Sequence, residues 1–170
     1  KNSFKYQYDD VHNLVKIVYP DKTIKEITYN KDKDWVTSFR NRKGCTENYA
    51  YEVDKDNPKD HYWSTVEKLC GQKVTNKSTY EFFHRSRKDG LGKYLYRVRT
   101  DNNGSVSDIV YHETFGKPIS VLRNKYKVTY SYYPNGLIKT KEENLRALSF
   151  KYDGKCQKVS EVEITFYQPD

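Results

Sequence analysis

Apolar and polar residues alternate over short stretches of this chain, and clusters of Asp, Asn, Gly and Pro separate the stretches. An extended strand directs successive side chains to opposite faces, so this alternation is typical of strands with one buried face. The clearest example begins with Tyr6 and Tyr8, turns over residues 9–13, and continues as a second strand that ends before Pro20. About a dozen such strands follow one another through short turns, which predicts a curled antiparallel sheet.

One segment carries a different pattern. The Asn-Pro pair at 57–58 is typical of a helix start, and Gly71 is a natural helix end. The apolar residues between them are spaced at i, i+4, i+7 and i+8, which places them on one helical face; they are Tyr62, Val66, Leu69 and Cys70. We therefore expect one amphipathic helix over residues 58–70 that packs against an open side of the sheet.

Tyrosines recur about every 20 to 22 residues. They form two series, Tyr8, Tyr29 and Tyr51, and then Tyr111, Tyr132 and Tyr152. A period of this size is typical of a repeat in which each unit is one supersecondary element, here a β-hairpin. The sequence predicts a single mainly β domain over residues 1–170, with first repeats at 1–53, a helical insertion at 54–78 and further repeats at 79–170.

The opening unit resembles the YD repeat of RHS proteins, which reads approximately Tyr-x-Tyr-Asp-x-x-Gly-Asn-Leu and then a run ending in Pro-Asp-Gly. The matching positions are Tyr6, Tyr8, Asp9, Asn13, Leu14, Pro20 and Asp21. The chain departs from the pattern at His12 and Lys22, where the family usually has Gly. The Tyr-Tyr-Pro-Asn-Gly stretch at 132–136 is also similar to the hairpins of MORN-like repeats, which are our second choice.

The RHS resemblance implies an elongated antiparallel sheet that curls or spirals. Large family members close that sheet around a toxin or form cell-surface scaffolds, and this chain has too few repeats to enclose a protein. Some relatives carry an autoproteolytic segment with catalytic acidic residues, but nothing in this sequence matches it. We therefore carry over no catalytic residue.

Composition changes the picture in two ways. The chain has 17 tyrosines, whose rings bury apolar area while the hydroxyl stays polar, so a low mean hydropathy is compatible with a folded sheet. The net charge of +8 suits an anionic partner, although lysines spread along strands are equally a solvated surface.

No apolar run is long enough to span a membrane. Because the chain begins at Lys1 rather than Met, we expect trimmed or processed material. With the leading hypothesis of a bacterial repeat module goes an expected location that is secreted, periplasmic or on the cell surface.

The three cysteines, Cys45, Cys70 and Cys156, lack the spacing of a zinc site. Our leading prediction is a disulfide between Cys45 and Cys70 with Cys156 as a free thiol. A helix that ends at Cys70 would face the core, where Cys45 could reach it. The alternative is three buried free thiols.

The run from Phe82 to Lys88 interleaves aromatic and cationic side chains. Stacking aromatics beside cations are typical of sites for single-stranded nucleic acid. Our candidate ligand-binding residues are Phe83, His84, Arg85 and Arg87, with Trp63 beside the apolar stripe of the expected helix. Because no RNP, helix-turn-helix or zinc motif is present, we favour a glycan, an anionic envelope polymer or a protein partner over nucleic acid. A plain structural role stays open, since alternation alone produces one buried face.

Candidate metal and catalytic residues are weak. Asn30, Asp32 and Asp34 carry the alternating oxygens of a calcium loop, but Trp35 stands where the sharp turn needs Gly and Asn41 where the bidentate Glu belongs. None of the four histidines neighbours a Ser or Cys in a way that suggests a nucleophile pair. We predict no metal, no cofactor and no catalytic residue.

The expected function is a non-enzymatic repeat module that binds or scaffolds through its curled sheet. Two alternatives stay open. One is an enzyme directed at the cell wall, with a site built from loops. The other is a small protein that neutralises a toxin.

Overall fold

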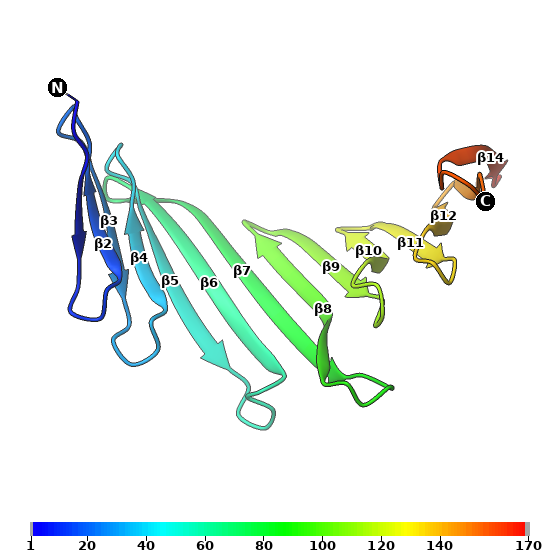
Figure 1. Ribbon diagram of the computed structural model, residues 1–170, viewed down its shortest axis with the longest axis horizontal. Coiled ribbons are helices and arrows are strands. Elements are labelled where there is room, and N and C mark those ends of the chain that lie inside the picture. The colour runs from blue at the N-terminus through cyan, green and yellow to red at the C-terminus, as the bar shows by residue number, and fades with distance from the viewer. Residues whose placement is uncertain (1, 169–170) are drawn as a thin grey trace. The chain divides into compact units, whose positions relative to one another are not determined.

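The structure is a computed structural model that describes residues 2–168, which contain fourteen strands and no helix (Figure 1). The strands are β1 (Lys5–Tyr8), β2 (Leu14–Val18), β3 (Ile24–Tyr29), β4 (Val36–Arg40), β5 (Thr46–Val53), β6 (His61–Cys70), β7 (Lys73–Ser86), β8 (Lys93–Asn102), β9 (Ser105–Tyr111), β10 (Pro118–Arg123), β11 (Tyr126–Tyr132), β12 (Ile138–Glu143), β13 (Arg146–Tyr152) and β14 (Val159–Phe166). No helix in this part of the chain is long and apolar enough to cross a membrane.

All fourteen strands belong to one antiparallel sheet, and each strand pairs only with its neighbours in the sequence, in the order β1 to β14. The predicted mainly β, antiparallel fold is therefore confirmed. Short turns explain this order, because a chain that reverses within a few residues brings consecutive strands side by side. Within the described residues, β1 and β14 each have one partner, so they are the two edges of the sheet.

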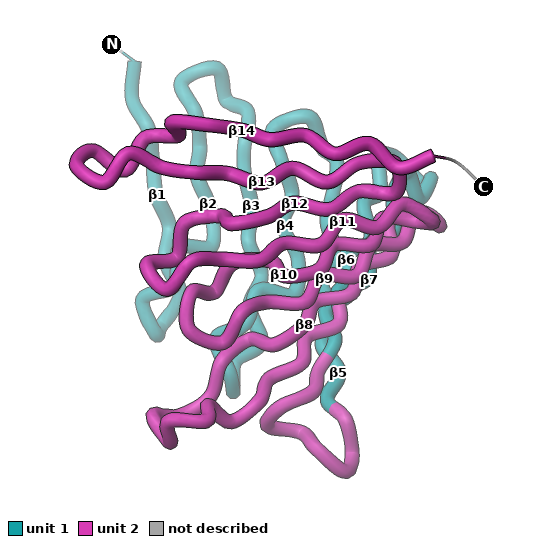
Figure 2. The backbone as a smooth tube through the Cα atoms, turned by 90° about the vertical axis from the view of Figure 1, so that its right-hand side faces the viewer, with its two compact units in different colours: residues 1–53, 63–80 teal, residues 54–62, 81–170 magenta. Residues whose placement is uncertain are grey.

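The chain divides into two compact units, shown in different colours in Figure 2. Unit 1 consists of Lys1–Val53 and Trp63–Tyr80, and unit 2 consists of Asp54–Tyr62 and Glu81–Asp170. Unit 1 thus contains β1 to β5, most of β6 and the first part of β7, and unit 2 contains the start of β6, the end of β7 and β8 to β14. Both units consist of hairpins.

The expected helix over residues 58–70 is wrong. Residues 58–60 form a turn in which the Asn57 carbonyl accepts hydrogen bonds from the Asp60 and His61 amides, at 3.1 and 3.0 Å, and the chain then extends as β6. The segment is rich in aromatic and β-branched residues, which favour strands. All ten residues of β6 are half-buried, so both faces are partly covered and apolar periodicity does not separate strand from helix here.

Few side chains of this sheet are buried among the residues that the structure describes. Among the described residues the buried hydrophobic side chains are Val98 and Val128, at 9% and 8% exposure. Because all strands lie in one sheet, a side chain is covered mainly by its neighbours on the same face. Cross-strand pairs are therefore the main source of stability, and large aromatic rings supply the most contact area per residue.

Three of the six recurring tyrosines form the same kind of hydrogen bond. The hydroxyls of Tyr29 and Tyr51 donate to the carbonyls of Leu14 and Val36, at 3.2 and 2.8 Å. The Tyr132 hydroxyl donates to the carbonyl of Pro118 at 2.5 Å. In each case the acceptor is the first residue of the preceding strand. At these three positions the tyrosine hydroxyl joins the start of one strand to the strand that follows it.

Five turns also share one geometry, in which the fourth residue donates its amide hydrogen to the carbonyl of the first. The donors are His12, Lys22, Gly44, Gly90 and Gly136, at 3.1, 2.9, 3.0, 3.2 and 2.8 Å. All five have positive φ, at 71°, 66°, 80°, 74° and 80°. His12 and Lys22 therefore hold a left-handed backbone that glycine adopts without steric cost.

A disulfide joins Cys45 and Cys70, the pair named from the sequence, and it links two residues 25 positions apart within unit 1. Cys70 is the last residue of strand β6 rather than of a helix. Cys156 is a free and exposed thiol, so the alternative of three buried thiols is excluded.

Candidate functional site

The candidate residues from the sequence lie in different surroundings. On β7 the Phe83 ring stacks on His61 at 4.3 Å between centroids, whereas the next ring, His84, stacks on Tyr62 at 5.6 Å. Trp63 belongs to unit 1, whereas β7 residues from Glu81 onward belong to unit 2. Arg85 lies over the Tyr96 ring, with its guanidinium carbon 3.4 Å from the centroid.

His84 also has an unusual ring nitrogen. Its Nδ1 atom is buried and has no hydrogen-bond partner within residues 2–168. The ring itself is half-buried between its neighbours and stacks on an aromatic side chain. His84 therefore packs as an aromatic residue, and it does not reach the cleft beside Arg85.

Arg85 lines an open cleft of about 580 Å³ in unit 2. The cleft is built from the end of β7, the start of β8, the end of β9 and the two turns that follow β7 and β9. Its lining residues are Arg85, Lys88, Asp89, Tyr94, Tyr96, Tyr111, His112, Glu113, Thr114 and Ile119. We call it the first cleft. Its volume falls in the range of about 300–1,000 Å³ that small-ligand sites occupy.

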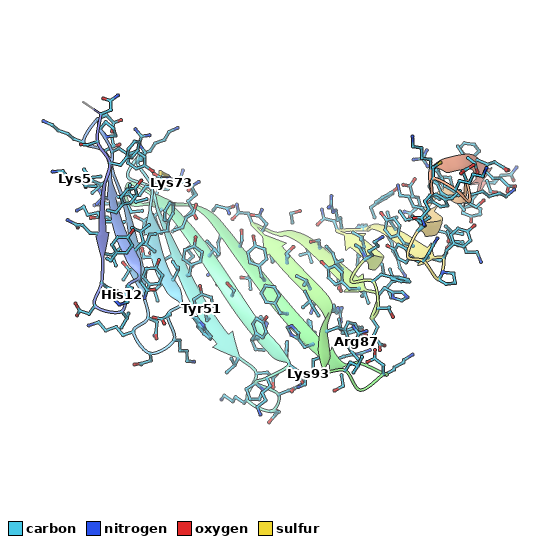
Figure 3. The ribbon with its side chains drawn as sticks, in the orientation of Figure 1. Lys5, His12, Tyr51, Lys73, Arg87 and Lys93 are labelled. Atoms are coloured by element: carbon cyan, nitrogen blue, oxygen red, sulfur yellow. A yellow bond between two sulfur atoms is a disulfide. The ribbon has the colours of Figure 1, made fainter. Side chains whose placement is uncertain are left out.

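Arg87 stabilises the two turns that line the first cleft, and Figure 3 labels it at the end of β7. Its guanidinium donates to both carboxylate oxygens of Asp89, at 3.0 to 3.2 Å, and to the carbonyl of Glu113 at 3.2 Å. The Arg87 hydrogen bonds and the amide of Leu91 hold the pKa of Asp89 below its ordinary value. Arg87 thus ties together the two turns that form the cleft.

The two acidic side chains of the first cleft are already engaged, whereas two cations are not. Asp89 binds Arg87, and the Glu113 carboxylate accepts the Lys88 amide hydrogen at 2.6 Å. Neither the Arg85 guanidinium nor the Lys88 ammonium forms an ion pair with any residue in the described range. The positive groups of this cleft are therefore the ones that remain for a ligand.

His112 has a structural role in this cleft. Its Nδ1 atom accepts the amide hydrogens of Thr114 and Phe115, at 3.1 and 3.4 Å, and its ring stacks on Phe115 at 4.4 Å. An accepting Nδ1 places the proton of the neutral ring on Nε2. The ring is thereby fixed as part of the turn after β9.

A second cleft of about 520 Å³ lies between the turns that follow β11 and β13. Its lining residues are Tyr133, Pro134, Asn135, Leu137, Lys151, Tyr152, Asp153, Gly154 and Gln157. Tyr133 and Tyr152 meet edge to face, with centroids 6.2 Å apart. All four turns that form the two clefts connect an odd-numbered strand to the next even-numbered one, so both clefts lie at the same end of the strands of unit 2. We call this end the cleft rim.

A row of acidic and basic side chains crosses the strands of unit 2. Its members, which we call the charge ladder, are Asp54, His61, Glu81, Arg99, Asp108 and Arg97. His61 approaches Asp54 Oδ2 through Nδ1 at 2.9 Å and Glu81 Oε1 through Nε2 at 2.8 Å. Arg97 binds Asp108 through two nitrogens, one of them Nε at 2.7 Å.

The acids and bases of the charge ladder satisfy one another. Hydrogen bonds from the Asn57 amide and His61 hold the pKa of Asp54 below its ordinary value, and Arg97 does the same for Asp108. Within residues 2–168 no group of three or more His, Cys, Asp or Glu side chains is placed to hold a metal ion. The charge ladder therefore links neighbouring strands to one another, and the clefts are the candidate functional sites.

Three tyrosines of the first cleft, Tyr94, Tyr96 and Tyr111, did not emerge from the sequence as candidates. A usable signal was present. The Asn103-Gly104 turn pairs Asn102 with Ser105 and Arg97 with Val110. Continuing that register by one position brings Tyr96 beside Tyr111, on the face opposite Arg97.

Comparisons with known proteins add no assignment, since no protein-family model and no curated protein matches the chain. The function must therefore be argued from the residues of the two clefts and from the repeat of the fold.

Proposed function

We propose that this protein is a non-enzymatic module of RHS/YD-type hairpin repeats that binds an anionic polysaccharide along the cleft rim. In this proposal the module is secreted or attached to a bacterial cell envelope. The observation that carries it is the recurrence of a tyrosine-lined cleft with a cationic side chain at the same end of the strands.

Two features of the backbone support the repeat assignment. The hydroxyls of Tyr29, Tyr51 and Tyr132, which belong to the two tyrosine series, form the same kind of hydrogen bond to the start of the preceding strand. His12 and Lys22, which stand where the YD pattern has Gly, adopt the left-handed backbone that Gly favours. Both features agree with the resemblance of the opening unit.

The chemistry of the first cleft supports a glycan with negative charge. Tyr94, Tyr96 and Tyr111 offer aromatic surfaces with polar tips, which suit a ligand that presents both apolar faces and hydroxyl groups. Arg85 and Lys88 supply charge-assisted hydrogen bonds for carboxylate or sulfate groups. The chain's net charge of +8 adds a favourable long-range field.

Repetition along the cleft rim favours a polymer over a small molecule. The second cleft offers Tyr133, Tyr152 and Lys151, although here the Lys151 ammonium is paired with the exposed carboxylate of Glu161 at 3.0 Å. A ligand with a repeating unit can occupy both clefts at once, and two linked contacts raise the affinity well above that of either one alone. A monosaccharide gains nothing from the second cleft.

The test is isothermal titration calorimetry with polygalacturonate, a polymer of uronic acid, and with its fully methyl-esterified form as the neutral control. The acidic polymer should bind, and the neutral form should bind at least about tenfold more weakly, because a charge-assisted hydrogen bond contributes about 1.5–3 kcal/mol. Added salt should weaken binding of the acidic polymer.

Variants locate the site. Arg85→Gln should raise the dissociation constant about tenfold, since it removes the charge and keeps a polar side chain. Arg40→Gln, on an exposed position of β4 in unit 1, is the matched control and should leave binding unchanged. Equal binding of the acidic and neutral polymers, or equal effects of the two variants, would contradict the proposal.

A further inference from the structure

The two edge strands of the sheet carry exposed apolar side chains. On β14, Ile164 and Phe166 are 48% and 73% exposed, and on β1 Tyr6 is 54% exposed. Ile164 lies opposite Leu148 of β13, and Tyr6 lies opposite Ile17 of β2, so each of these side chains continues an apolar face of its own unit. Both edges end in apolar surface that a further strand would cover.

The other face of each edge strand is charged, and the two charges are opposite. Glu161 and Glu163 alternate with the apolar residues of β14, whereas Lys5 alternates with Tyr6 on β1. Figure 3 labels Lys5 on the first strand. Charged residues on an edge normally prevent pairing with another sheet. Here they oppose pairing of like edges and favour pairing of unlike ones.

The direction of the strands permits such a contact. Along the sheet each strand runs antiparallel to the strand before it, so a strand that continues this order beyond β14 also runs antiparallel to β14. A second copy that presents its β1 to the free edge of β14 therefore forms an antiparallel pair, and the faces of the two sheets continue into one another. Free backbone N–H and C=O groups on both edges supply the hydrogen bonds.

We propose that β14 of one copy pairs with β1 of a second copy, so that the sheet extends from chain to chain. A register that places Lys5 opposite Glu163 also places Tyr6 opposite Val162, because both strands alternate with a period of two. Apolar side chains then meet apolar ones on one face, and opposite charges meet on the other. An apolar groove of about 600 Å³, lined in part by Tyr126, Leu145 and Phe166, adjoins the same edge and adds contact surface.

Pairing of like edges is disfavoured by the same residues. Two copies of β14 would bring the glutamates of one strand against those of the other, and two copies of β1 would bring Lys5 near Lys5. Like charges directly opposite each other destabilise a strand pair. The contact is therefore head to tail, and it leaves a free β1 at one end and a free β14 at the other, so association continues as the concentration rises.

The experiment is sedimentation velocity of the full chain over a series of concentrations, in a Cys156→Ser background that prevents intermolecular disulfides. The protein should associate as concentration rises. Lys5→Glu and Glu163→Lys should each raise the dissociation constant about tenfold, since each replaces attraction by repulsion across the pair. The double variant Lys5→Glu/Glu163→Lys should restore association, because it exchanges the charges and keeps their complementarity.

Two matched charge reversals away from the edges are the controls. Glu52→Lys on β5 and Lys73→Glu on β7 change exposed positions on interior strands and should leave association unchanged. Circular dichroism of each variant checks the fold, and both edge positions are exposed.

Three results would each overturn the proposal. They are a monomer at every concentration, association that neither single edge variant weakens, and a double variant that fails to restore what the single variants lose. The glycan proposal concerns the cleft rim rather than this pairing of edge strands, so the titration with polygalacturonate tests it separately.

Discussion

Unit 1 and unit 2 consist of the same kind of hairpin, but different bonds hold their strands together. In unit 1 the disulfide between Cys45 and Cys70 connects the start of β5 to the end of β6. In unit 2 the charge ladder connects β6, β7, β8 and β9 through His61, Glu81 and Asp108, whose side chains are 17% or 18% exposed. A sheet with little buried apolar surface needs such links, and this chain uses a covalent one and an ionic one.

The ion pairs of unit 1 differ from the charge ladder in their exposure. Asp21 with Arg42, and Glu67 with Lys77, lie at positions where solvent reaches both partners. Exposed pairs contribute about 0–1 kcal/mol because water screens them. The disulfide is therefore expected to stabilise unit 1 more than its ion pairs do. In unit 2 the less exposed charge ladder is expected to have the corresponding role. The two units should respond differently to reduction and to acid.

Reduction should have the largest effect, and it should act on unit 1. Removal of a disulfide that closes a 25-residue span should cost about 3 kcal/mol of unfolding free energy, since the unfolded chain regains the freedom of that loop. Hydrogen exchange read by mass spectrometry should accelerate in β2 to β5 of the Cys70→Ser variant and stay unchanged in β11 to β13. Cys156→Ser is the control, since that thiol is free and exposed. Equal acceleration in both units would show that the disulfide stabilises the sheet as a whole.

Acid should act first on unit 2. Among the described carboxyl groups, those with a lowered pKa in unit 2 are Asp54, Asp89, Asp108, Glu143 and Asp153, whereas unit 1 has Asp21 alone. A carboxyl group with a lowered folded-state pKa stabilises the fold above its unfolded pKa, and that stability is lost as the pH falls through the folded value.

The acid effect should therefore begin as the pH falls below about 4, near the ordinary pKa of these groups, and should grow below it. Hydrogen exchange in a pH series should find unit 2 opening at a higher pH than unit 1. The effect should be smaller than that of reduction, because none of these groups is fully buried and solvent screens each pair. Asp108→Asn should remove part of the difference, and a parallel loss in both units would contradict the comparison.

The smallest effect separates two glycines of the same turn type, one in each unit. Gly44 and Gly136 both have φ of 80°, so alanine should cost about 1 kcal/mol at either position. A Cβ at Gly136 would also lie 3.1 Å from Phe115 Cδ1, whereas one at Gly44 has nothing within 4 Å. Urea denaturation should therefore give Gly136→Ala a free energy of unfolding about 1 kcal/mol lower than that of Gly44→Ala, because of this crowding. Equal losses would mean that the Phe115 ring moves aside.

Sequence patterns predicted most of the strands because a strand needs only local alternation and a turn. They failed at residues 58–70, where Tyr62, Val66 and Leu69 fit a helical face as well as a strand with two half-covered faces. The Cys45–Cys70 pair was named even so, since the pairing depends on which residues approach rather than on the element that carries them.

The cleft was harder to predict than the fold. Arg85 stood out because it lies in a run of aromatic and cationic residues. Tyr96 and Tyr111 are separated in the sequence by a hairpin, so their meeting depends on the register set by the Asn103-Gly104 turn. Binding residues drawn from several strands become visible only after that register has been worked out.

The strict β1 to β14 order also determines how the chain folds. Every strand finds its partners among its immediate neighbours in the sequence, so contact order is low and no hairpin waits for a distant segment. During synthesis, β1 and β2 can pair as soon as both have left the ribosome, and each later strand then adds to an existing edge. The growing end of the nascent sheet is always a free strand edge, and β14 is the last of these edges within the described residues.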